Sequence, residues 1–294
     1  MTSEHPRQYV RFTHGRFAVQ RFWGELPDSV TVGIFSTVAV ARDGTVYVAQ
    51  RAGPPVLVFA PDGTFRHAWP AGLAIDPHGI SVSPNVSPED EEQVLLVDRD
   101  AHQVLVCTPG GEVRMRLGAA GVPRFQAPFN HPTAAAAAPD GDIYVADGYG
   151  NSMVHRFDAN GHHVASWGQP GSGPGEFSTP HAICVDRANR VLVADRENGR
   201  IQAFDRNGNH LESWGGFYNP MAVSEDGDGH LYVTDQVPRV SQLRPDGNLV
   251  GRARPAWNVP HGIACAPDGR LFIAEMNPNS LLCLAPVPED DATS

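Results

Sequence analysis

The sequence predicts an all-β protein folded as a six-bladed β-propeller, and three observations support this prediction. An apolar run, a turn and a second run rich in β-branched residues recur six times along the 294 residues. The second runs end 48, 49, 48, 40 and 40 residues apart, at Gln50, Asp98, Asp147, Asp195, Asp235 and Glu275. Gly and Pro number 30 and 26, which supplies the turns that many short strands require. Repeats of about 40–50 residues with four strands each are typical of propeller blades.

Each repeat provides the first two strands of a blade, and the repeats begin near residues 36, 77, 132, 180, 220 and 260. Third strands follow, for example at 154–157 and 201–204. Pairs such as Asn160-Gly161 and Asn207-Gly208 then provide the positive φ that a tight hairpin needs. No segment has a convincing 3.6-residue apolar period, so we expect no long helix. The sequence therefore predicts a single propeller domain over residues 1–294.

The last repeat ends at about Val287 without an outer strand of its own. Two outer strands end in Trp-Gly, at Trp167-Gly168 and Trp214-Gly215, and the same pair occurs at Trp23-Gly24. We therefore expect residues 8–24 to complete the last blade and close the ring, which removes exposed strand edges. Within this segment Tyr9 to Phe12 provides a further strand, unless Leu281 to Leu284 takes that place. The acidic tail 288–294 is expected to be loose.

Composition and charge exclude several classes of protein. The net charge of −11 leaves no basic footprint for a nucleic-acid partner. No run approaches the ~20 apolar residues of a membrane span, so we expect no membrane partner. The four cysteines are far apart and the first eleven residues have no apolar signal region, which favours reduced thiols in the cytoplasm.

The starts of the first strands meet at one end of a propeller's axial channel, and histidine recurs there. The aligned positions are Ser36, His78, Thr133, His181, Met221 and His261. A single histidine at such a position is more often a polar residue bonded in the channel mouth. Three in alternate blades, pointing at the axis from three directions, favour a metal site with open positions for water and substrate. We expect zinc there, or another divalent transition metal.

The residues that follow the second strands reach the same channel mouth. They are Arg51, Arg99, Gly148-Tyr149, Arg196, Gln236 and Met276. Arginines near a metal suit a small anionic substrate, because guanidinium binds carboxylate in a bidentate fork. A tyrosine there can act as a general base when nearby cations stabilise its phenolate.

The alternative is that these arginines pair with neighbouring acids such as Asp98, Asp195 or Glu197. We favour that pairing for Arg99 and leave both readings open for Arg51, Tyr149 and Arg196. His131 is one residue out of phase with the histidine series, and the sequence assigns it no role.

Longer motifs resemble a known family. The run from Gly168 to Gly208 looks like NHL repeats, and this likeness covers most of the chain. Within that group, DGYGNSMVHRF (Asp147 to Phe157), FSTPHAI (Phe177 to Ile183) and VADRENGRIQAF (Val193 to Phe204) resemble the peptidyl-α-hydroxyglycine α-amidating lyase.

This resemblance implies that His78, His181 and His261 bind zinc, that Tyr149 is the catalytic tyrosine, and that Arg51 and Arg196 are the active-site arginines. The family's calcium-binding aspartate falls on Gly262, so a structural calcium ion is not expected.

Three functions remain to be distinguished. The first is a zinc-dependent lyase that cleaves the C–N bond of a carboxylate-bearing N-acyl hemiaminal, of the α-hydroxyglycine or ureidoglycolate type. The second is a non-catalytic NHL binding platform. The third is a metal-dependent hydrolase on the same scaffold, of which a lactonase ranks last because no carboxylate calcium ligands lie in register.

Overall fold

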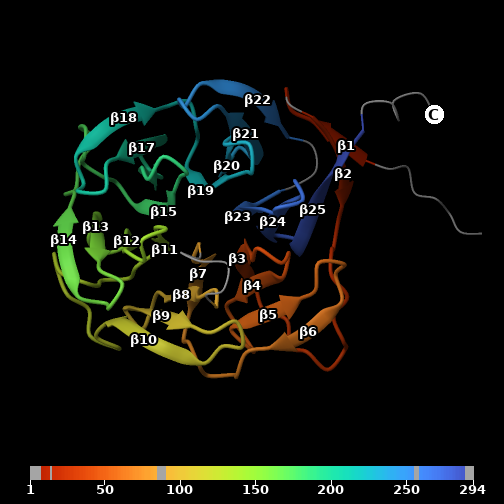
Figure 1. The fold of residues 1–294 in the computed structure, drawn as a ribbon, viewed down its shortest axis with the longest axis horizontal. Coiled ribbons are helices and arrows are strands. Elements are labelled where there is room, and N and C mark those ends of the chain that lie inside the picture. Colours follow the sequence, from red (N-terminus) through yellow and green to blue (C-terminus); the bar gives the residue numbers. More distant parts are fainter. Residues whose placement is uncertain (1–7, 14, 85–90, 255–257, 289–294) are drawn as a thin grey trace, which may run out of the picture.

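The computed structural model describes residues 8–13, 15–84, 91–254 and 258–288. It is a six-bladed β-propeller, as the repeats predict, with six antiparallel sheets around a central axis (Figure 1). The innermost strands of neighbouring blades pack against one another in a closed ring, β3, β7, β11, β15, β19 and β23. The described part of the chain contains no helix, and hence none long and apolar enough to cross a membrane.

In each of the first three blades, the four strands follow one another from the axis outward in chain order. Blade 1 consists of β3 (Phe35–Val40), β4 (Val46–Gln50), β5 (Val56–Phe59) and β6 (Phe65–Ala68). Blade 2 consists of β7 (Pro77–Val82), β8 (Val94–Asp98), β9 (Gln103–Cys107) and β10 (Val113–Gly118). Blade 3 consists of β11 (Ala134–Ala137), β12 (Ile143–Asp147), β13 (Met153–Phe157) and β14 (His163–Trp167).

The other three blades complete the ring. Blade 4 consists of β15 (Pro180–Val185), β16 (Val191–Asp195), β17 (Arg200–Phe204) and β18 (His210–Trp214). Blade 5 consists of β19 (Pro220–Glu225), β20 (Leu231–Asp235), β21 (Arg239–Leu243) and β22 (Leu249–Ala253). Blade 6 has five strands, in the order β23 (Pro260–Cys265), β24 (Leu271–Met276), β25 (Asn279–Val287), β2 (Arg16–Gln20) and β1 (Gln8–Arg11).

The two ends of the chain meet in blade 6. β2 pairs with β25 in an antiparallel register that joins Arg16 to Val287 and Gln20 to Cys283, and β1 pairs with β2 on the outside (Figure 1). Leu281 to Leu284 belongs to the third strand, so both segments that the sequence set in competition have a place in the sheet. Residues 289–294 of the predicted loose tail lie outside the described residues.

The hydrophobic core lies mainly between blades. Second strands are buried along their whole length because both of their faces contact a neighbouring blade. Between blades 6 and 1, for example, Val48 and Phe59 pack in one cluster with Phe272. The turn glycines serve this packing: at Gly208, where φ is +86°, a Cβ would lie 2.5 Å from the Trp167 ring of the preceding blade.

The residue at the end of each second strand has a structural role that the sequence pattern does not reveal. These six side chains are buried and accept hydrogen bonds from main-chain N–H groups just before the innermost strand of the same blade. The acceptor–donor pairs are Gln50 with Gly33, Asp98 with Ile75 and Asp76, Asp147 with Asn130, Asp195 with Ser178, Asp235 with Tyr218, and Glu275 with Asn258. They fix the chain where each innermost strand begins, which is where the histidine series lies.

Candidate metal centre

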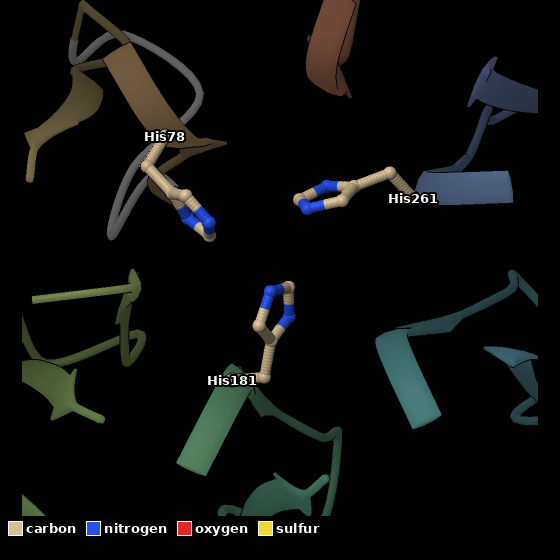
Figure 2. Close-up of side chains that lie close together, drawn as sticks. All are labelled: His78, His181 and His261. Carbon is tan, nitrogen blue, oxygen red and sulfur yellow. The ribbon is translucent and has the colours of Figure 1, made fainter. Parts of the chain in front are cut away.

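His78, His181 and His261 lie together at one end of the axial channel, one on each of β7, β15 and β23 (Figure 2). Their ring centroids are 4.9–5.2 Å apart, and the rings point toward one another from three directions. All three are buried, with 1%, 2% and 5% of their surfaces exposed. Within the described part of the chain, these three histidines are close enough together to hold a metal ion between them.

Main-chain carbonyls fix the orientation of all three rings. The Nδ1 atoms lie 2.7, 2.7 and 2.5 Å from the carbonyl oxygens of Thr133, Met221 and Ser36. Since a carbonyl can only accept, each Nδ1 carries the proton and donates it. Each Nε2 therefore keeps its lone pair and faces the axis, which is the arrangement found for histidine ligands whose second nitrogen is held by the protein.

The alternation of histidine with other residues has a structural reason. Thr133, Met221 and Ser36 are the residues that occupy the histidine position in blades 3, 5 and 1, so each histidine donates to the next blade. The hydroxyl groups at two of these positions donate onward to the next blade. Ser36 Oγ donates to Pro77 O over 2.8 Å, and Thr133 Oγ1 donates to Pro180 O over 2.7 Å. The serine and threonine thus fix the residues that precede His78 and His181.

Burial keeps the three imidazoles neutral. Removal from water lowers the pKa of His261 to about 3, and the positive charge of Arg51 acts in the same direction. Burial, followed by the neighbouring histidines, also lowers the pKa of His78 and of His181 well below the ordinary value. Three neutral imidazoles with their lone pairs directed at one point are ready to bind a cation.

The donor set and its spacing fit a transition-metal ion. The ligand nitrogens lie within 4.8 Å of one another. Tetrahedral zinc with Zn–N bonds of about 2.0–2.1 Å requires N···N separations of roughly 3.4 Å. Binding thus requires each N···N separation to shorten by at most about 1.4 Å, which small rotations of the rings can provide. Three imidazoles leave at least one coordination position open, as in catalytic sites.

Tyr149 lies beside two of the three histidines. Its Oη is 3.1 Å from His78 Nε2 and 3.1 Å from His181 Nε2. Both nitrogens are acceptors, so the single phenolic hydrogen can serve only one of them at a time. The main chain of Tyr149 is held by a bond from its N–H to the carbonyl of His131, 3.3 Å away. The side chain is 39% exposed, so a substrate can reach it.

Arg51 and Arg99 share one buried acid, Asp76. Arg99 Nη2 lies 2.6 Å from Asp76 Oδ2, whereas Arg51 Nε is 3.7 Å from Asp76 Oδ1. Burial raises the pKa of Asp76 even though both guanidinium groups oppose the shift. Arg99 also pairs with Asp100 over 2.8 Å, and its guanidinium lies 5.6 Å from the Tyr149 ring centre. Arg99 is therefore engaged with acids, but with Asp76 and Asp100 rather than with Asp98.

Arg51 and Arg196 differ from Arg99 in having an unsatisfied polar atom. The Nε atom of each is buried and has no hydrogen bond within the described chain. Arg196 Nε lies 3.1 Å from Glu197, whose side chain is 40% exposed, in an ion pair without hydrogen-bond geometry. Buried donors without partners are uncommon and call for an explanation, such as a ligand that completes them.

His131 and Gly262 lie near the histidines but do not contribute metal ligands. His131 does not join the metal group: its Nδ1 is 2.9 Å from Asn130 Oδ1, and its ring packs edge-on against His102. At Gly262, a Cβ would lie 2.6 Å from the Cα of Thr37, so this position has no room for a side chain. An aspartate at Gly262 would therefore clash with the first strand of blade 1.

An axial cavity of about 490 Å³ lies on the other side of the histidines. It is lined by residues that follow the histidine position in each innermost strand, among them Thr37, Gly79, Ala182 and Ala222. The arginines and Tyr149 lie at the opposite end, where second strands finish. The cavity has charged residues of its own, Arg42, Glu92 and Glu225, but none of them belongs to the group around the histidines.

Comparison with known proteins supports the sequence resemblance. The NHL repeat family matches residues 129–157 and 177–204. The chain is 31% identical over 191 residues to NHL repeat-containing protein 3 of Homo sapiens, covering 61% of this chain and 54% of that protein. It is 29% identical over 254 residues to peptidyl-α-hydroxyglycine α-amidating lyase 1 of Drosophila melanogaster, covering 74% and 46%.

A probable peptidyl-α-hydroxyglycine α-amidating lyase of Caenorhabditis elegans is 37% identical over 139 residues, covering 45% of this chain and 37% of that protein. The chain therefore spans about half or less of the length of these curated relatives. It contains NHL repeats and has amidating lyases among its relatives in sequence.

Solved structures share the architecture at low sequence identity. A gluconolactonase from Xanthomonas campestris superimposes with a TM-score of 0.71 at 17% identity, covering 96% of each chain. A virginiamycin B lyase from Staphylococcus aureus gives 0.64 at 16%, covering 94% of this chain and 90% of the other. At this identity the likeness shows the propeller fold alone.

Proposed function

We propose that this protein is a metal-dependent lyase that cleaves the C–N bond of a carboxylate-bearing N-acyl hemiaminal. The products are an amide and an α-oxo acid such as glyoxylate. One observation carries the proposal: three neutral imidazole Nε2 atoms converge on the axis, with the Tyr149 hydroxyl 3.1 Å from two of them. The sequence similarity to amidating lyases supports the same reaction class.

His78, His181 and His261 would hold the ion, for which we propose zinc. When bound, zinc supplies a Lewis acid that makes a neighbouring hydroxyl more acidic. The protein's task is then to remove a proton and to hold the charged ends of the substrate.

Tyr149 acts as the phenolate, its own proton having been released to solvent before the reaction, and accepts the proton of the substrate hydroxyl at its Oη. The oxygen's electron pair then forms the C=O bond of the α-oxo acid while the C–N bond breaks. Tyr149 returns the proton to the departing nitrogen, which leaves as the neutral amide. Atoms and protons balance without water, so the reaction is an elimination rather than a hydrolysis.

Arg51 and Arg196 bind the substrate's anionic groups. They lie in blades 1 and 4, on opposite sides of the axis, and the side chain of each is 21% exposed, so its guanidinium is partly accessible to a substrate. We assign one guanidinium to the carboxylate and the other to the negative charge that develops as the C–N bond breaks. Arg99 is excluded from this role because Asp76 and Asp100 already occupy it.

The proposal is tested by metal analysis and product release on protein purified without an affinity tag. We expect about one equivalent of zinc per chain, and α-oxo acid from an N-acyl-α-hydroxyglycine or ureidoglycolate. Tyr149→Phe should keep the metal and lose about 10²–10⁴-fold in kcat, whereas His181→Ala should lose both.

Less than about half an equivalent of any transition metal would favour the non-catalytic binding platform instead. Full activity in Tyr149→Phe would refute the assignment of the base. Consumption of one water per turnover would identify a hydrolase.

A further inference from the structure

The rim around the three histidines is divided into two chemically different sectors. In blades 2 to 5, the rim carries polar groups, among them Arg99, Asp76, Tyr149, Arg196 and Gln236. In blades 6 and 1, the equivalent positions carry Ile34, Val259 and Met276. Arg51 stands at the boundary, since its N–H donates to the carbonyl of Ile34 over 2.9 Å.

The three apolar residues lie in loops of blades 6 and 1 that hydrogen bonds tie together. Met276 N–H donates to Val259 O over 3.1 Å, which places these two side by side. Asn279 then bridges the blades: its Oδ1 accepts from Phe35 N over 2.7 Å, and its Nδ2 donates to Gly33 O on the other side of Ile34. Ile34 is 46% exposed, and Val259 and Met276 are half-buried, so all three present apolar surface to solvent.

The position of Tyr149 determines which sector faces the rest of the substrate. Its Oη contacts His78 and His181, and within the described chain it has no hydrogen bond to His261. When the substrate hydroxyl meets Tyr149, the side of the cluster that the tyrosine leaves free is the side of His261, and we place the acyl group there. His261 belongs to blade 6 and donates to Ser36 O in blade 1, so this side is the apolar sector.

We infer that Ile34, Val259 and Met276 bind the acyl group of the substrate, and that this group is a bulky apolar carbon chain or ring. The inference rests on the proposed function for the direction of the substrate. It divides the substrate classes that the sequence leaves open, because a ureido compound ends in a polar NH₂ group. Such a group gains nothing from burial against three aliphatic side chains.

The test measures binding of unreactive analogues to the zinc-loaded protein by calorimetry. N-hexanoylglycine, N-acetylglycine and N-carbamoylglycine lack the hydroxyl and differ only in the group on nitrogen. Hexanoyl adds four methylenes to acetyl, and partial burial of these at the rim predicts about tenfold tighter binding. N-carbamoylglycine should bind no more tightly than N-acetylglycine.

Two variants and one matched control locate the effect. Ile34→Ser and Met276→Gln should reduce the hexanoyl-to-acetyl ratio from about tenfold to about threefold or less while binding of N-acetylglycine changes little. Val164→Ser removes an apolar side chain of similar exposure, 50%, from the outer strand β14, and should keep the full ratio. Ile34 is 46% exposed and lies outside the buried core, so its replacement should not unfold the protein.

The outcomes separate this inference from the proposed function. Equal affinities for the analogues, no detectable binding, or an unchanged ratio in both rim variants would overturn the inference. The expected ratios without cleavage of N-hexanoyl-α-hydroxyglycine would support the acyl site and refute the lyase. Cleavage without any acyl preference would support the lyase and refute the acyl site.

Discussion

Acid should destabilise the metal-free protein through the same burial that prepares the histidines for metal. His261 has a pKa of about 3 in the folded protein against an ordinary value of 6.5. Below pH 6.5 the unfolded chain binds a proton at this residue that the folded protein refuses. The stability contributed by the neutral imidazole is therefore complete above pH 6.5 and falls as the pH decreases toward 3.

The size of the effect follows from the shift. Between pH 7 and pH 5 the folded His261 remains neutral while the unfolded residue becomes protonated, which costs about 2 kcal/mol of unfolding free energy. The pKa values of His78 and His181 are lowered in the same direction, so the whole cluster adds to this loss.

The assay is urea unfolding of chelator-treated protein at pH 7 and pH 5. The variant His261→Gln serves as the comparison, since its amide can still donate to Ser36 O but does not titrate. The wild type should lose about 2 kcal/mol more than the variant between the two pH values. Equal losses in both proteins would refute the claim that His261 is held neutral by burial.

Three other substitutions test separate parts of the account. Arg196→Lys should raise KM, measured by steady-state kinetics, by about ten- to a hundredfold at unchanged metal content, because lysine lacks the bidentate fork of arginine. An unaltered KM would exclude Arg196 from substrate binding. Gly262→Asp should lower the urea midpoint by the equivalent of about 1–3 kcal/mol because its Cβ would meet Thr37, and a wild-type midpoint would argue against this contact. Ser36→Ala removes the donor to Pro77 O and should cost about 1–3 kcal/mol in the same assay, whereas no loss would mean that water replaces the bond.

The fold was predictable because every local signal repeats. Turn pairs such as Asn207-Gly208 and the apolar second strands recur every 40–49 residues, a repeat length that is typical of propeller blades. The order of the strands within blade 6 was less predictable from the sequence. Two segments competed for one place because a five-stranded sheet exceeds the four-strand unit on which the expectation was built.

The histidine series was visible because blade geometry converts spacing into direction. His78, His181 and His261 occupy the same position in alternate strands, so their convergence follows from the repeat. The partners of these side chains were not visible. The carbonyl acceptors of Nδ1 belong to neighbouring blades, and a main-chain carbonyl leaves no trace in the sequence.

The arginines show the same limit. The engagement of Arg99 with acids was expected from adjacent charges, but the dominant partner is Asp76, which is distant along the chain. Why Arg51 and Arg196 retain unsatisfied Nε atoms while Arg99 does not depends on loop positions that no residue pattern encodes.

The central claim is that one metal ion at the three histidines enables a C–N bond cleavage. It is tested most directly by titrating zinc into chelator-treated protein while following glyoxylate release from N-hexanoyl-α-hydroxyglycine. We predict a rate that rises linearly with added zinc and reaches a plateau at about one equivalent of zinc per chain. A rate that never exceeds the uncatalysed reaction, or that does not depend on zinc or another transition metal, would contradict it.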